Sequence, residues 1–98
     1  MCGATKGGLS VEGIDVTKEA VVQGLVVHDD SPVGGAYVRL LDSGGEFTAE
    51  VPTSASGHFR FFAAPGSWTL RVLAPGTTPV DRAVVARRGA VAEVEIAV

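Results

Sequence analysis

The sequence is poor in the side chains that most active sites and cross-links need. It has one cysteine, Cys2, which excludes an internal disulfide, a four-cysteine zinc site and a CxxC redox pair. Its two histidines, His28 and His58, leave little material for a metal cage. Aromatic residues make up only 6% of the chain, and no apolar run reaches the ~18 residues that span a bilayer. We therefore expect no metal, no cofactor and no membrane partner.

Excess charge is lacking as well. There are 8 basic and 11 acidic side chains, a net charge of -3, so a nucleic-acid partner is not expected. The N-terminus does not have the charged and then apolar layout of a secretory signal, and we expect a cytoplasmic protein. With 98 residues, the chain can form one domain around a single core.

What the sequence does contain is typical of β-structure. Valine is abundant, while 13 glycines and 5 prolines interrupt the chain at short intervals. Apolar and polar residues alternate in short runs, which we predict to be strands over residues 21–28, 36–41, 47–53, 58–63, 68–72, 80–86 and 91–98. Seven short strands predict an all-β fold, a seven-stranded antiparallel Greek-key sandwich.

The alternation also assigns faces to the strands. The residues predicted to be buried are Val38, Phe59, Phe61, Trp68, Leu70 and Val94, and Phe47 is placed inward with Ala49 and Val51. Tyr37, Leu41 and Phe62 are predicted to face outward and to form an apolar patch, which suggests a homo-oligomer or a docking surface.

Residues 1–18 do not share this pattern. They hold four glycines and only scattered apolar positions. We predict a flexible N-terminal arm over residues 1–18 and a sandwich domain over residues 19–98.

Several short motifs between residues 21 and 73 belong together. They are Gly24-x-Val26, Pro32-Val33-Gly34-Gly35-Ala36-x-Val38, Ser56-Gly57-x-Phe59-x-Phe61 and Pro65-Gly66-x-Trp68-x-Leu70-x-Val72. In this order they resemble the prealbumin-like, carboxypeptidase-regulatory-type domain, which is also a carbohydrate-binding-like fold. The resemblance implies the same two-sheet architecture.

A second resemblance covers nearly the whole chain. It is carried by the opening Met1-Cys2-Gly3-Ala4 with Lys6-Gly7-Gly8, by the stretch from Arg39 to Val51 and by the stretch from Phe59 to Arg71. These segments are similar to small actinobacterial proteins of uncharacterised function that are commonly encoded beside a thiosulfate sulfurtransferase of the rhodanese type. The resemblance implies an association with sulfur metabolism and brings no reaction with it.

Cys2 is the residue that would serve such a role. If the initiator methionine is removed, Cys2 carries both the α-amino group and the thiol, and the ammonium charge lowers the thiol pKa. Such a thiol can accept a sulfane sulfur as a persulfide, with Lys6 assisting electrostatically. The opposing interpretation is a tolerated cysteine in an arm without a role.

An enzyme is not expected. A transthyretin relative hydrolyses a purine-derived ring, but that resemblance would require a C-terminal Tyr-Arg-Gly-Ser, and this chain ends in Glu95-Ile96-Ala97-Val98. Ser56, His58 and Asp42 can be written as a triad, yet no nucleophile elbow accompanies them. Related collagen-adhesin modules form a Lys–Asn isopeptide bond, for which this sequence offers no asparagine.

Three different predicted strands each carry an arginine at an outward-facing position: Arg39, Arg60 and Arg71. With Lys6 they are candidate contacts for an anion or for the carboxylates of a partner. They could equally pair across strands with the acids Glu46, Glu50, Glu93 and Glu95.

The preferred functional hypothesis is a non-enzymatic accessory protein of sulfur metabolism, a binding partner or sulfur acceptor of a thiosulfate sulfurtransferase through Cys2. The alternative is a protein-interaction or carbohydrate-binding module that uses its sheet surface and has no role for the thiol.

Overall fold

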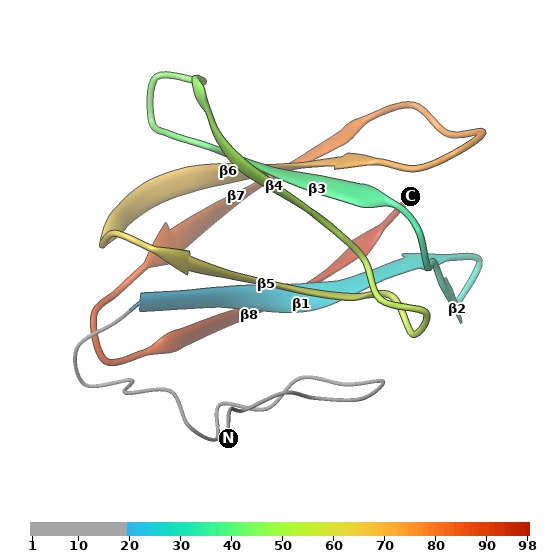
Figure 1. The fold of residues 1–98 in the computed structure, drawn as a ribbon, viewed down its shortest axis with the longest axis horizontal. Helices are drawn as coiled ribbons and strands as arrows, with labels where there is room; N and C mark the ends of the chain where they lie inside the picture. Colours follow the sequence, from blue (N-terminus) through green and yellow to red (C-terminus); the bar gives the residue numbers. More distant parts are fainter. Residues whose placement is uncertain (1–19) are drawn as a thin grey trace.

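The computed structural model describes residues 20–98 and folds them into two β-sheets packed face to face (Figure 1). The strands are β1 (Ala20–His28), β2 (Ser31–Pro32), β3 (Tyr37–Leu41), β4 (Phe47–Pro52), β5 (His58–Ala63), β6 (Gly66–Leu73), β7 (Val80–Ala86) and β8 (Val91–Ala97). Sheet A contains β2, β1, β5 and β8, and sheet B has the order β4-β3-β6-β7. The all-β sandwich is therefore confirmed. None of the described residues forms a helix, so none forms one that could cross a membrane.

The sandwich differs from the prediction in strand count and in one pairing. The additional strand, β2, has two residues and lies between the predicted strands 21–28 and 36–41. The last strand, β8, pairs with β1 in parallel, from Val21 opposite Val91 to Val27 opposite Ala97, while all other pairs are antiparallel. A parallel pair requires a crossover connection, and here β8 returns to sheet A only after β6 and β7 have been added to sheet B. The predicted arm lies outside the described residues.

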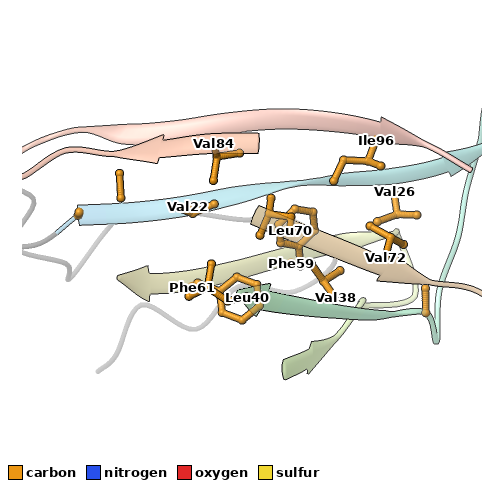
Figure 2. Packing of buried hydrophobic residues seen from close by; sticks show 13 residues of the cluster. Val22, Val26, Val38, Leu40, Phe59, Phe61, Leu70, Val72, Val84 and Ile96 are labelled. Carbon is orange, nitrogen blue, oxygen red and sulfur yellow. The ribbon is translucent and has the colours of Figure 1, made fainter. Parts of the chain in front are cut away.

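The core lies between the two sheets and consists of aliphatic side chains around two phenylalanines (Figure 2). Burial of Val38, Phe59, Phe61 and Leu70 is confirmed. Trp68 and Val94 also pack against the core but are only half-buried, so their predicted full burial is wrong. Both lie at the margin of the buried cluster, and Trp68 Nε1 donates a hydrogen bond to the Ala64 carbonyl oxygen at 2.8 Å.

One glycine in the middle of β1 allows the strands of sheet A to approach closely. A Cβ added at Gly24 would collide with the Val94 carbonyl oxygen and would lie 2.8 Å from Phe59 Cζ. Gly24 therefore permits β8 and the Phe59 ring to pack against the same point of β1.

A β-bulge changes the predicted face of one aromatic residue. The pairing of β3 with β4 shifts between Leu40 and Leu41, so that Leu40 lies opposite Ala49 and Leu41 opposite Phe47. The extra residue, Thr48, breaks the alternation on β4. Phe47 is consequently 62% exposed on the outer face, and the prediction that it points inward is wrong.

Candidate functional site

Four charged side chains form a row across the outer face of sheet B. Glu50 on β4 lies opposite Arg39 on β3, Arg39 lies opposite Arg71 on β6, and Arg71 lies opposite Asp81 on β7. The four residues, here named the charged row, are cross-strand partners on four adjacent strands. Positions that are paired in this way across the sheet are called a level. Since neighbouring strands are about 4.8 Å apart, the row spans about 14 Å.

Each arginine of the charged row is bonded to the acid beside it. Arg39 Nε donates to Glu50 Oε2 at 2.7 Å. Arg71 donates from Nε and Nη2 to the two carboxylate oxygens of Asp81 at 2.8 and 3.0 Å. The hydrogen bond from Arg71 lowers the pKa of the Asp81 carboxyl, and the same bond raises the pKa of the Arg71 guanidinium. The ion pairs direct the Arg39 side chain toward β4 and the Arg71 side chain toward β7, from neighbouring positions on the two central strands.

The levels on either side of the charged row carry exposed aromatic side chains. Tyr37, one level away along β3, is 50% exposed, with Pro52 and Leu73 as its cross-strand partners. Phe47 lies on the other side of the row, and the Arg39 guanidinium carbon is 6.0 Å from the centroid of its ring. Tyr37, Phe47 and the charged row together are called the sheet B face below.

A shallow hollow continues the sheet B face beyond the level of Phe47. Its volume is about 310 Å³, and its lining is Ser43, Ser67, Trp68, Thr69, Ala83, Val84 and Val85. Leu41 separates Phe47 from Thr69 at this level and is only 5% exposed, although we predict an exposed residue there. Its burial follows from its position between these two cross-strand partners.

A second hollow lies on sheet A, and its buried polar side chain, Gln23, is hydrogen-bonded within the protein. Its volume is about 360 Å³, and it is lined by Gln23, Gly24, Leu25, His58, Glu93, Val94 and Glu95. Gln23, 6% exposed, donates from Nε2 to Glu93 Oε2 at 2.9 Å and accepts from Arg60 Nε at 3.2 Å. Within residues 20–98, no three metal-binding side chains gather closely enough to hold an ion. The bonding of Gln23 indicates a structural network.

The structure brings together two of the predicted contact residues. Arg39 and Arg71 are cross-strand partners on sheet B, whereas Arg60 bonds Gln23 on sheet A. The three arginines therefore do not converge. Cross-strand pairing is confirmed for Arg39 with Glu50, while the partner of Arg71 is Asp81, which the sequence reasoning missed. Cys2 and Lys6 lie outside the described residues.

Neither the triad nor the predicted apolar patch forms. His58 Nδ1 lies 3.0 Å from Ser56 Oγ, but the Asp42 carboxylate accepts the backbone N–H groups of its own turn. Tyr37 lies on sheet B and Phe62 on sheet A. Because the two sheets face opposite sides of the sandwich, these aromatics cannot join one patch.

The comparison with known proteins gives a family match over almost the whole chain. The family model described as "Protein of unknown function (DUF1416)" matches residues 2–98. Two uncharacterised proteins of Mycobacterium tuberculosis strain H37Rv are each 61% identical over 75 residues, which is 74% of this chain and 75% of theirs. The names of these relatives mention no sulfurtransferase, so that association stays a prediction.

The fold is similar to that of solved structures with low sequence identity. The major pilin subunit BcpA of Bacillus cereus, as a D312A variant, superposes with a TM-score of 0.71 at 19% identity. The match covers 82% of this chain, which spans only 28% of the pilin's length. The 5-hydroxyisourate hydrolase of Klebsiella pneumoniae gives a TM-score of 0.62 at 20% identity, over 80% of this chain and 88% of the hydrolase. At these identities the likeness shows a shared β-sandwich fold.

Proposed function

This chain belongs to the DUF1416 family, and we propose that it acts as a non-enzymatic protein-binding domain whose contact surface is the sheet B face. The proposal takes up the second of the two hypotheses from the sequence, in which the sheet surface does the work.

The observation that carries it is the composition of that face. Exposed tyrosine and phenylalanine side chains lie on either side of two arginines on one continuous sheet. Aromatic residues and arginine are enriched in protein interfaces, and tyrosine and arginine dominate among the residues that supply most of the binding energy. The hollow beside Thr69 adds a depression into which a partner's side chain can fit.

The arrangement favours a protein partner over a carbohydrate. Sugar sites need acceptors for hydroxyl protons as well as donors, and the acceptors on this face, the carboxylates of Glu50 and Asp81, are already bonded to arginines. The arginine donors that the ion pairs leave unused are better suited to the acidic groups of a protein partner, which the arginine charges also help to orient.

Site-specific photo-crosslinking in the native cell tests the proposal. A photoreactive phenylalanine analogue is placed at Tyr37 or Phe47 on the sheet B face, and at Phe62 as the control. Phe62 is a matched control because it is 56% exposed on the other sheet. We expect the same protein to be crosslinked from both sheet B positions and not from Phe62. Crosslinking of that protein from Phe62 alone, or of no protein from either sheet B position, would contradict the proposal.

The finer hypothesis names a thiosulfate sulfurtransferase as the partner and Cys2 as a sulfur acceptor. It is supported by the sequence resemblance and has a direct test. The protein is incubated with thiosulfate and a sulfurtransferase, and mass spectrometry is used to detect a sulfur adduct on Cys2, with Cys2→Ser as the control. An adduct that persists in the serine variant argues against Cys2. Fractionation of the native cells used for photo-crosslinking tests the expected cytoplasmic location.

A further inference from the structure

The arginines at the middle of the charged row have binding capacity that their ion pairs leave unused. We propose that Arg39 and Arg71 form a carboxylate-binding centre, which receives an aspartate or glutamate side chain of the protein partner. The inference rests on the proposed function, because it specifies the chemistry of the partner at the sheet B face.

Free hydrogen-bond donors are the first argument. A guanidinium has five N–H donors. Arg39 uses its Nε for Glu50, and Arg71 uses Nε and Nη2 for Asp81. Among residues 20–98, no other acceptor is bonded to either group, and the two side chains are 43% and 41% exposed. A carboxylate can therefore accept several charge-assisted hydrogen bonds there without displacing Glu50 or Asp81.

The order of charges is the second argument. Across the sheet the row runs negative, positive, positive, negative, from Glu50 to Asp81. Each acid is bonded to its arginine from the neighbouring outer strand, so an incoming carboxylate placed over the centre meets the two cations first. This order of charges is symmetric, so it is the same from Asp81 to Glu50 as from Glu50 to Asp81. A second copy stacked with its row in register would thus set like charges against each other, which is unfavourable.

The neighbouring levels define what should flank the acid. Tyr37 lies one level from the arginines on one side, and the hollow at Thr69 and Ala83 begins one level away on the other. Levels on one strand are two residues, or about 7 Å, apart, which is the spacing of alternate side chains in an extended peptide. The geometry points to an extended partner segment with the pattern apolar–x–acid–x–apolar.

A nuclear magnetic resonance titration of the full chain tests this inference. The probe is the blocked peptide Leu-Ser-Glu-Ser-Leu, and the control is the same peptide with Gln in place of Glu. We expect the Glu peptide to shift the Nε–Hε signals of Arg39 and Arg71. The Gln peptide should bind at least about tenfold more weakly, because hydrogen bonds to a charged group are lost. Arg39→Gln and Arg71→Gln should each weaken binding, whereas Arg60→Gln, on the other sheet, should not.

Several results would overturn the carboxylate-binding centre. The first two are equal affinities of the Glu and Gln peptides, and NMR signal shifts that are confined to sheet A. The others are binding of a neutral oligosaccharide that leaves the arginine signals unshifted, and arginine signal shifts from inorganic sulfate that equal those from the Glu peptide. Because Arg39→Gln and Arg71→Gln each remove an ion pair, a cooperative thermal transition well above the titration temperature is the control that excludes a folding defect. If photo-crosslinks from Tyr37 persist while the peptides show no acid preference, the carboxylate centre is wrong and the protein-binding function stands. If the crosslinks are also absent, both are wrong.

Discussion

Two adjacent phenylalanines on β5 provide a matched test of the sandwich. Phe61 is 4% exposed and packs beside Phe59, with a ring-centroid separation of 6.2 Å, whereas Phe62 is 56% exposed on the outer face. Replacing Phe61 by alanine leaves a cavity between the sheets and should lower the free energy of unfolding by about 3–5 kcal/mol. A domain of this size has a total of about 5–15 kcal/mol, so the loss is a large fraction of it. For Phe62→Ala we expect about 1 kcal/mol or less, since its ring remains largely in water.

Urea titration followed by tryptophan fluorescence measures both variants, because Trp68 is the single tryptophan and packs against the core. At about 4–8 °C per kcal/mol, Phe61→Ala should also lower the melting temperature by at least about 12 °C. The milder Phe61→Leu keeps a folded reference if the alanine variant does not fold. Equal losses at the two positions, or a loss below about 1 kcal/mol for Phe61→Ala, would refute the assignment of faces on β5.

Three further predictions concern other parts of the sandwich. Gly24→Ala should destabilise the domain by about 1–3 kcal/mol in urea titration, since its Cβ would meet the Val94 carbonyl; unchanged stability would contradict this close approach. Asp81→Asn should lower stability near neutral pH but not in acid. Because the pKa of Asp81 is lowered in the folded state, its charge stabilises the protein above the unfolded pKa of about 3.9, and this stability is lost as the pH falls through the folded pKa. The free energies of unfolding of the two proteins, plotted against pH, should therefore converge below about pH 4. A constant difference across the whole pH range would contradict this prediction. Asp30→Gly should raise the melting temperature and stabilise by up to about 1 kcal/mol, because Asp30 has a φ of 67° in the two-residue turn between β1 and β2; a lower melting temperature would contradict this.

The fold could be predicted from local patterns to a large extent. The predicted segments 58–63 and 80–86 coincide with β5 and β7, because apolar alternation and turn residues are properties of neighbouring positions in the chain. The same alternation identified Phe59, Phe61 and Leu70 as core residues. It failed for Phe47, since a bulge inserts one residue and reverses every face beyond it.

The candidate site was only partly predictable. The sequence indicated that Arg39, Arg60 and Arg71 point outward, and it offered several acids as partners. It did not indicate that Arg39 and Arg71 share a level while Arg60 lies on the other sheet. The pairing of Arg71 with Asp81 depends on the register of the β6–β7 hairpin, whose loop spans residues 74–79 and is too long for that register to be counted from a two-residue turn.

The sequence by itself determined most of the apolar side chains that point inward, and therefore that two sheets enclose one core. Its two-residue period is a local property, since successive side chains on a strand point to opposite faces whatever the strand is paired with. Only the tertiary structure decided the parallel pairing of β1 with β8 and the order of Glu50, Arg39, Arg71 and Asp81 across sheet B. These features depend on strand neighbours and registers between segments far apart in the chain, which are set by the packing of the whole sandwich and not by any one stretch of residues.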